Sequence, residues 1–460
     1  MKLLDTIAAV STPRGKGGVA MIRISGAEAV AVGGRMFRPA NRKDLSEIAH
    51  GQCVYGEIVM PDGSSVDDGM AVCFRAPRSF TGEDTVEITC HGGVLVTSKV
   101  LSAALMAGAR AAEAGEFTRR AYLSGKLKLT EAESLGNLLE AGTEGQLALA
   151  RSGMKGHLSR RTEEIYERLR TVMASIFAAI DFPDEDLTEM SREQMIASAE
   201  TSLGEIRGLM RTYSTGRAVS EGIPTVICGR TNAGKSSVYN RILGYDAAIV
   251  TDVEGTTRDV LRESASLGKT LLRLCDTAGL RDTEDLVESM GIERTREEMR
   301  RAGLILAVFD VSEEPREEDA ALAREIKELG IPAIALWNKT DRGSRGATQS
   351  LEACFEHSLS VSAKDGDGFE KLGEMIDALF VDGSLDIGED AVVTGARQYA
   401  ALSAAKEALS DALSDLQANL PLDLCCVGIE DALLSLGQVD GRELGEEIVA
   451  EIFSRFCVGK

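Results

Sequence analysis

Aromatic residues make up only 4% of this 460-residue chain, and histidine occurs four times. The hydrophobic cores must therefore be mainly aliphatic, and no histidines have the spacing of a zinc site. The nine cysteines are dispersed and include no C-x-x-C pair. An odd number of scattered cysteines is typical of reduced thiols, so we expect a cytoplasmic location.

Long apolar runs are also missing, and no stretch of about 18 apolar residues predicts a membrane span. The first 14 residues lack a basic segment followed by an apolar one, so we expect no secretory signal. The formal charge is −22, from 51 Lys and Arg against 73 Asp and Glu. Such a chain does not hold phosphate backbones through its overall field, so a contact with nucleic acid must be local or made through a second protein.

Proline is nearly absent from one long stretch, since Pro183 is the only proline between Arg78 and Ile223. That gap permits long helices, and apolar residues at three- and four-residue spacing predict several. Expected helices cover residues 94–107, 129–150, 158–180, 195–212, 399–418 and 447–456. Expected strands cover residues 19–25, 69–74, 85–89, 226–228, 271–275, 304–310, 333–337 and 359–361.

A nucleotide motif stands where strands and helices begin to alternate. Gly229–Ser236 matches the pattern G-x-x-x-x-G-K-S, after an apolar strand and before a helical stretch. Lys235 can place its charge on the β- and γ-phosphates, and Ser236 can offer a hydroxyl to Mg²⁺ at the start of a helix. A chance glycine-rich turn is the alternative, and the motifs that follow argue against it.

Three further motifs stand in the order that a guanine-nucleotide domain requires. Asp276–Gly279 follows a predicted strand, where the aspartate can hold a Mg²⁺-bound water and the glycine can meet the γ-phosphate. Asn338–Asp341 follows another strand, and the Asp341 carboxylate can accept two hydrogen bonds from guanine, which adenine cannot donate. Ser362–Lys364 fits the loop behind the base. GTP is therefore expected rather than ATP.

The predicted contacts to GTP or GDP gather around these motifs and around a threonine-rich segment after the first of them. Gly255–Asp259 fits a switch loop in which Thr257 completes the Mg²⁺ shell with Ser236, and an ordinary polar turn is the alternative. The full set is Asn232, Ala233, Gly234, Lys235, Ser236, Ser237, Thr251, Asp252, Val253, Glu254, Gly255, Thr256, Thr257, Asp276, Thr277, Ala278, Gly279, Asn338, Lys339, Thr340, Asp341, Ser362, Ala363 and Lys364.

The usual water-orienting residue is absent. Many small GTPases have glutamine where this chain has Leu280. The acidic segment from Arg281 to Glu293 either is a solvated loop or supplies a carboxylate that orients water, and spacing alone does not choose among its members. Asn232 either bonds its own backbone or helps to hold a monovalent cation that neutralises charge beside the phosphates.

We therefore predict a multidomain α/β fold in which a helical domain is interrupted by an inserted Ras-like P-loop G domain with a mainly parallel sheet. The expected boundaries are an N-terminal α/β domain at residues 1–118, the first helical part at 119–215, the G domain at 216–382 and the second helical part at 383–460.

Several segments outside the G domain carry a resemblance along essentially the whole chain. They are Asp5–Ala9, Gly17–Gly26, Ser79–Asp84, His91–Gly93, Ala114–Ala121, Ala179–Pro183 and the terminal Phe456–Lys460. The chain resembles the MnmE family of tRNA-modification GTPases, also called TrmE. The terminal Cys-x-Gly-Lys is specific to this setting, whereas the P-loop alone is generic.

The resemblance implies site residues that the pattern alone does not identify. The N-terminal domain would form a homodimer and bind 5-formyltetrahydrofolate, or a related one-carbon folate, through Arg23, Glu87, Lys126 and Lys460. A potassium ion would sit at Asn232, Thr251, Val253 and Thr256, and Glu288 would be the catalytic carboxylate. Cys457 would have a chemical role, with a buried helix-end thiol as the equal alternative.

The resemblance also implies partners. The G domains of the homodimer would pair, and a flavin-dependent protein, MnmG, would join them in a heterotetramer. Together they would modify carbon 5 of the wobble uridine, position 34, of certain tRNAs with an aminomethyl or carboxymethylaminomethyl group.

Three positions depart from the family pattern: Thr231 replaces a proline, Lys128 an aspartate and Val458 an isoleucine. One alternative is a ribosome-assembly GTPase acting as a switch, which would need a basic RNA-binding module. The other is a folate-binding protein whose G domain is only structural or regulatory.

Overall fold

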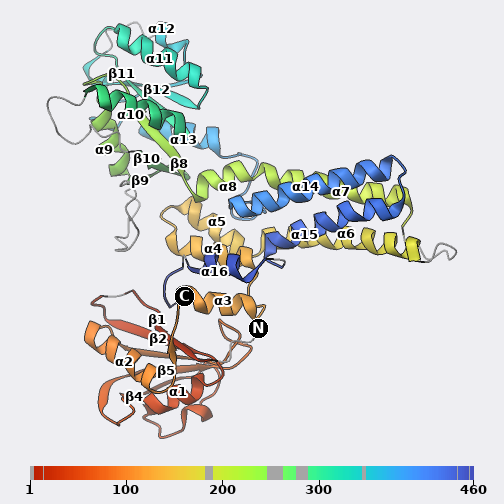
Figure 1. The fold of residues 1–460 in the computed structure, drawn as a ribbon. Coiled ribbons are helices and arrows are strands. Elements are labelled where there is room, and N and C mark those ends of the chain that lie inside the picture. Colours follow the sequence, from red (N-terminus) through yellow and green to blue (C-terminus); the bar gives the residue numbers. More distant parts are fainter. Residues whose placement is uncertain are drawn as a thin grey trace. The chain divides into compact units, whose positions relative to one another are not determined.

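The computed structural model describes residues 5–13, 15–181, 190–245, 263–275, 288–343, 349–442, 444–454 and 456–459. The chain forms two compact units: Met1–Gly136 with Leu436–Lys460, and Asn137–Ser435. Figure 1 shows the elements of each. The bounds of the four predicted segments stay predictions. None of the helices in the described ranges combines the length and the apolar character that crossing a bilayer requires.

A seven-stranded sheet organises the first unit, in the order β3-β4-β5-β6-β2-β1-β7. All of its pairings are antiparallel except that of β1 with β7. The strands are β1 (Ile7–Val10), β2 (Val19–Ser25), β3 (Phe37–Pro39), β4 (Cys53–Val59), β5 (Ser65–Phe74), β6 (Thr85–His91) and β7 (Arg110–Ala111). The helices α1 (Ala29–Met36) and α2 (Val94–Met106) share one apolar core with the sheet, while the short helix η1 is Leu45–Glu47.

The C-terminal segment belongs to this same unit. The helices α3 (Glu116–Leu123) and α16 (Glu446–Ser454) pack together, and α4 (Leu129–Glu140) begins within the unit. Beyond α16 the chain forms a bridge between Val458 and Ala114. Ser11 Oγ donates to the carbonyl of Gly459 at 3.0 Å, so the chain end lies beside the end of β1.

In the second unit, the parts of the chain before and after the sheet are helical. The helices are α5 (Glu144–Met154), α6 (His157–Asp181), α7 (Arg192–Arg211), α8 (Tyr213–Ser220), α14 (Ala396–Gln417) and α15 (Leu422–Asp440), of which α15 from Leu436 onward belongs to the first unit. The helical segment expected over residues 129–150 is divided between α4 and α5, because Thr143 caps α5 by accepting from the Gln146 N–H. α15 was not expected, since glycine is a poor helix former. Glycine is nevertheless favoured at position 428 of this helix, because a Cβ there would lie only 2.9 Å from the Ala408 carbonyl oxygen.

The inserted sheet has the order β13-β12-β11-β8-β10-β9 and is parallel except at β9 and β10. Its strands are β8 (Ile223–Cys228), β9 (Glu263–Leu267), β10 (Thr270–Leu274), β11 (Leu304–Asp310), β12 (Ala333–Asn338) and β13 (His357–Ser360). Its helices are α9 (Lys235–Tyr245), α10 (Glu288–Arg301), η2 (Thr340–Arg342), α11 (Glu317–Leu329), α12 (Gln349–Glu352) and α13 (Phe369–Phe380). Separate apolar cores cover its two faces, so the predicted mainly parallel sheet between helices is confirmed.

Candidate nucleotide site

The loop between β8 and α9 is tightly constrained at its glycines. Gly229 has φ +149° and Gly234 has φ +98°, both in the left-handed region that favours glycine. A Cβ on Gly229 would lie 2.3 Å from the Val308 carbonyl oxygen, and one on Gly234 would lie 2.2 Å from Asn338 Nδ2. The two motif glycines are therefore required by close approaches as well as by backbone angle.

Lys235 is the first residue of α9, and its ammonium group donates to the Arg230 carbonyl at 3.0 Å. Burial lowers the pKa of Lys235. A phosphate beside the ammonium would favour its charged form and oppose this effect. Ser236 and Ser237 follow in the first turn and are exposed, so the helix N-terminus presents hydroxyls and backbone N–H groups to an anion.

Asn338, at the end of β12, joins three segments that are distant in sequence. Its side chain is buried, and Nδ2 donates to the Ala233 carbonyl at 3.0 Å. Its Oδ1 accepts from the Ala363 N–H at 3.1 Å. The asparagine thus ties the P-loop to the loop after β13, and it does so only because β12 lies between these segments in the sheet.

Lys339 and Asp341 complete this side of the site. Lys339 donates to the Asn232 carbonyl at 2.7 Å and to Asp310 Oδ2 at 2.6 Å. Asp341 accepts from Ser362 Oγ at 3.3 Å, and Lys364 Nζ lies 4.0 Å from its other oxygen. The carboxylate is therefore positioned by the loop predicted to lie behind guanine.

Three contributors to the site were missed from the sequence. Asp310 ends β11 and holds the Lys339 ammonium. Arg241 of α9 donates through Nε to the Ala363 carbonyl at 3.0 Å and also bonds the Lys364 carbonyl. Arg230 is paired with Glu313 at 3.0 Å. Only Asp310 left a signal, as a charged residue at the carboxyl end of a buried strand.

Some predicted residues lie outside the described part of the chain. They are Thr251–Thr257, Asp276–Gly279 and Lys460. Glu288 is the first residue of α10, and its side chain is likewise outside what the structure describes. The switch loop, the potassium ligands in it and the catalytic carboxylate therefore stay predictions.

The predicted folate residues Arg23 and Glu87 are brought together by the sheet. They are direct partners on β2 and β6, and Arg23 Nε donates to Glu87 Oε1 at 2.8 Å. The Arg23 guanidinium also lies over the rings of Phe80 and Phe117, 5.4 and 5.8 Å from their centroids. The pair is mostly buried, so its orientation is set by the surrounding aromatic rings.

Lys126 and Cys457 are held by backbone bonds near the ends of other elements. The Lys126 N–H donates to the Ala121 carbonyl at 2.8 Å, just beyond α3. Cys457 is exposed, and its carbonyl accepts from the Gly115 N–H at 3.3 Å. The alternative of a buried thiol is therefore wrong, whereas a chemical role of Cys457 stays a prediction.

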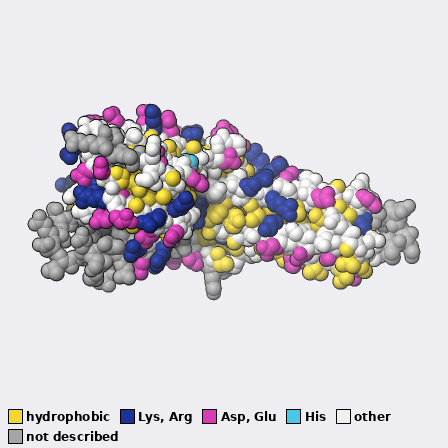
Figure 2. Space-filling model, turned by 90° about the horizontal axis from the view of Figure 1, so that it is seen from above, with side chains coloured by type: hydrophobic (Ala, Val, Ile, Leu, Met, Phe, Trp, Pro, Cys, Tyr) yellow, Lys and Arg dark blue, Asp and Glu magenta, His cyan; other side chains and the backbone are white. Residues whose placement is uncertain are grey.

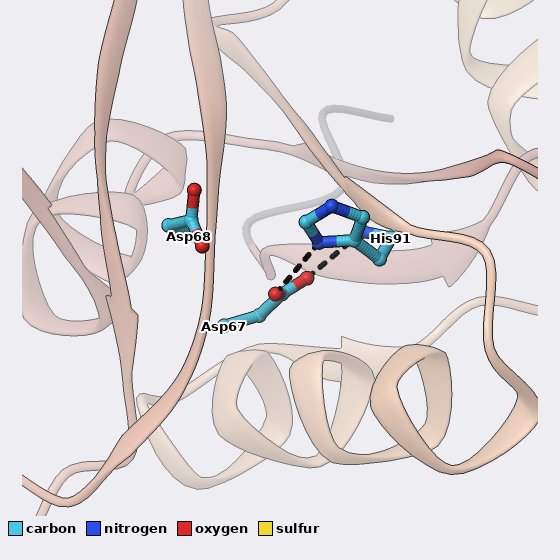
Figure 3. Close-up of side chains that lie close together, drawn as sticks. All are labelled: Asp67, Asp68 and His91. Carbon is cyan, nitrogen blue, oxygen red and sulfur yellow. Dashed lines mark hydrogen bonds and ion pairs between the residues drawn. The ribbon is translucent and has the colours of Figure 1, made fainter.

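A cluster outside the predicted sites is formed by Asp67, Asp68 and His91 (Figure 3). His91 Nδ1 lies 2.8 Å from Asp67 Oδ1, and the His91 N–H donates to the other oxygen of Asp67 at 2.8 Å. Asp68 accepts from the Tyr55 hydroxyl at 2.6 Å, while Asp67 raises the pKa of His91. The hydrogen bonds between β5 and the end of β6 explain why these three side chains lie together, and no metal is assigned to the cluster.

A P-loop tied through Asn338 to the loop after β13, with Asp341 held beside that loop, is the arrangement of a P-loop guanine-nucleotide-binding protein. Residues 129–457 match the family model described as the MnmE helical domain. Residues 6–126 match the model described as the GTP-binding protein TrmE N-terminus. The chain belongs to the MnmE family.

Relatives named tRNA modification GTPase MnmE match along nearly the whole chain. That of Symbiobacterium thermophilum is 40% identical over 458 residues, which is 99% of each chain. That of Bacillus subtilis is 38% identical over 461 residues, covering 99% of this chain and all of the relative. Among solved structures, Era of Aquifex aeolicus is 22% identical over 40% of this chain and 66% of that one, with a TM-score of 0.27.

Proposed function

We propose that this protein is a GTP-hydrolysing enzyme that acts in tRNA modification. The observation that carries the proposal is the junction at Asn338, which holds the P-loop and the guanine loop in one site. Full-length similarity to relatives named for tRNA modification supports the biological role. The ribosome-assembly alternative needs a separate basic module, and the family models account for both ends of the chain.

The nucleotide chemistry is assigned to residues of this chain in named roles. Lys235 and the first turn of α9 bind the phosphates, and Asp341 accepts from the guanine edge. Ser236 and Thr257 would hold Mg²⁺, which neutralises phosphate charge when bound. Glu288 would orient the attacking water in place of the absent glutamine. The exposed position of Ser236 at a helix N-terminus fits this arrangement.

Potassium is proposed as a second cation beside the phosphates. Its ligands would be Asn232, Thr251, Val253 and Thr256. Asn232 has φ +66°, its carbonyl is engaged by Lys339, and the residue is exposed. Its side-chain amide oxygen is therefore the group that remains for a cation. Such a charge stabilises the transition state in the way an arginine finger does.

The N-terminal unit is proposed to bind 5-formyltetrahydrofolate or a related one-carbon folate. Glu87 can accept hydrogen bonds from the pterin, while Arg23, Lys126 and Lys460 can meet folate carboxylates. The mostly buried Arg23–Glu87 pair, in which the guanidinium lies over two phenylalanine rings, supports a built site. Equilibrium dialysis with 5-formyltetrahydrofolate tests it, and absence of saturable binding would remove this cofactor.

The complete reaction is proposed to need partners. A homodimer would join the flavin-dependent MnmG in a heterotetramer and install an aminomethyl or carboxymethylaminomethyl group at carbon 5 of uridine 34. The exposed Cys457 is available for a role in this chemistry. Size-exclusion chromatography with light scattering, alone and with MnmG, tests the assembly; a monomer that ignores MnmG would exclude it.

The function is tested by the nucleosides of bulk tRNA from a strain lacking this gene. We expect the carbon-5 modification of the wobble uridine to disappear, other modified nucleosides to persist and a plasmid copy to restore it. Normal tRNA with altered ribosomal-subunit profiles would instead support the ribosome-assembly switch.

A further inference from the structure

The helical part of the second unit carries two segments without any acidic residue, although the chain as a whole has a charge of −22. Residues 206–220 cover the end of α7 and all of α8, and residues 391–406 cover the segment before α14 and its first half. Their basic residues are Arg207, Arg211, Arg217, Arg397 and Lys406. Figure 2 shows Lys and Arg side chains gathered on the visible side of the helical bundle.

These two segments lie against each other. Gln417 Nε2 donates to Glu200 Oε1 at 3.0 Å near one end of the helix pair, whereas Tyr213 and Tyr399 stack at 4.5 Å near the other. The helices α7 and α14 are therefore antiparallel. The Val393 N–H donates to Thr212 Oγ1 at 3.0 Å, which fixes the segment before α14 against the junction of α7 and α8.

The close contact is enforced by a glycine. A Cβ on Gly216 would lie only 2.1 Å from the Val393 carbonyl oxygen. The two segments thus form one rigid surface from parts of the chain about 180 residues apart. We refer to the surface of residues 206–220 and 391–406 as the basic face.

Two charges of the basic face have no carboxylate partner among the described residues. Arg207 and Arg211 are exposed, and across the described ranges neither guanidinium lies within ion-pair distance of a carboxylate. Their four-residue spacing places them on one side of α7. The neighbouring Glu205 turns away, since it pairs with Arg168 at 3.0 Å and Arg161 at 3.4 Å.

The helix surface beside these arginines is open at its two glycines. A Cβ on Gly204 would meet no atom within 4 Å, and one on Gly208 would meet only the Arg211 guanidinium, at 4.0 Å. Arg217 is paired with Glu221 at 3.0 Å, yet both side chains are more than 40% exposed, so the pair is readily exchanged for another anion.

We propose that the basic face binds the phosphate backbone of the RNA substrate. The proposal rests on the proposed function and supplies the local contact that so acidic a chain requires. Unpaired guanidinium groups bind phosphates through paired hydrogen bonds and release counterions on doing so. The rigid pairing of α7 and α14 keeps the charges in place before the RNA arrives, which limits the entropy lost on binding.

The test is the binding of bulk tRNA to the full-length protein, followed by fluorescence anisotropy from 50 to 200 mM salt, in the range where phosphate contacts dominate. The Arg207→Gln/Arg211→Gln double variant should bind about tenfold more weakly. The slope of log affinity against log salt should decrease by about 2, one for each lost phosphate contact. Intrinsic GTP turnover without tRNA should not change.

A matched control removes two exposed cations from another helix. Arg324→Gln/Lys327→Gln on α11 changes the net charge equally and should leave affinity and slope unaltered. Any of three results would overturn the proposal that the basic face binds RNA. The α7 variant could bind tRNA as tightly as the wild type, the control could lose as much affinity as the α7 variant, or the wild-type protein could fail to bind tRNA.

The proposed function is decided separately in cells. If the gene deletion removes the wobble modification while the α7 variant restores it fully, the function stands and the basic face fails. If the wobble modification is missing both in the deletion strain and in the strain that carries the α7 variant, and this variant has normal GTP turnover, the proposal for the basic face is supported.

Discussion

At the residue scale, we expect single side chains to decide which nucleotide this site accepts. Asn338 uses both its amide nitrogen and its amide oxygen for hydrogen bonds to the backbones of two other loops, so its role is to hold the site together. Asp341 is different, because among the described residues Ser362 is its one hydrogen-bond donor and Lys364 Nζ lies 4.0 Å away. Its carboxylate retains acceptor capacity for the two donors of guanine.

Asp341→Asn should exchange guanine for xanthine specificity. The amide presents a donor where guanine also presents one, so we expect GTP affinity to fall about 100-fold, since a buried unpaired donor is costly. Xanthosine triphosphate should bind better, and titration with fluorescent analogues of both nucleotides measures the change.

Asp367→Asn is the matched control, because Asp367 is exposed in the same loop and uses its backbone carbonyl to accept from the Ser362 N–H. It should leave both affinities unaltered. Retention of the GTP preference by Asp341→Asn would contradict the assigned base contact.

The start of α3 shows how one element is held in the N-terminal unit. Glu116 and Arg120 are both buried and lie 3.0 Å apart. Glu116 also accepts from Arg110 at 2.6 Å and from the Glu113 N–H at 2.9 Å. Burial alone would raise the pKa of Glu116, but the hydrogen bonds from Arg110 and Glu113 and the charge of Arg120 together lower it.

Glu116→Gln should destabilise the N-terminal unit by about 3 kcal/mol at pH 7, because buried Arg120 loses an anionic partner. The lowered pKa means that the native state favours the charged carboxylate, so this contribution is complete above the ordinary pKa of 4.5. It is lost as the pH falls through the folded-state pKa. Urea unfolding from pH 7 to pH 3 should therefore show the two proteins converging in acid.

Glu113→Gln provides the control, since its side chain is 70% exposed and 3.9 Å from Arg119. Its free energy of unfolding should stay within about 0.5 kcal/mol of wild type. A gap between wild type and Glu116→Gln that is the same at every pH would contradict the electrostatic explanation.

At the scale of the whole molecule, the G domain interrupts a helical domain whose two parts pack through α7 and α14. Hydrolysis lacks the usual glutamine, so the missing catalytic power must come from elsewhere. The proposed sources are Glu288, a potassium ion and pairing with a second copy of the chain.

GTP turnover in matched potassium and sodium buffers examines this mechanism. We expect turnover per molecule to be on the order of tenfold higher in potassium, because the proposed cation would supply the charge that an arginine finger supplies elsewhere. The potassium rate should also rise with protein concentration if G domains pair. Glu288→Ala should bind GTP and stay near zero in both buffers. Equal rates in both buffers would remove Asn232 and the 251–256 segment as a potassium site.

Local patterns in the sequence were sufficient for the nucleotide motifs and most of the strands and helices around them. The glycines of the P-loop, the polar residues that end buried strands and the apolar periodicities each reflect a requirement of nearby backbone. The expected mainly parallel sheet follows from their order. The sequence did not predict α15, because its glycines lower helix propensity and its packing against α14 is a long-range contact.

Contacts between distant segments were decided only by the tertiary structure. The pairing of Arg23 with Glu87 depends on the register of β2 and β6, and the junction at Asn338 depends on the order of strands in the sheet. The basic face exists because Gly216 lets α8 approach the segment before α14. The sequence alone determined that this chain binds guanine nucleotides, since those motifs are local; the surfaces depend on how remote elements pack, which no local propensity specifies.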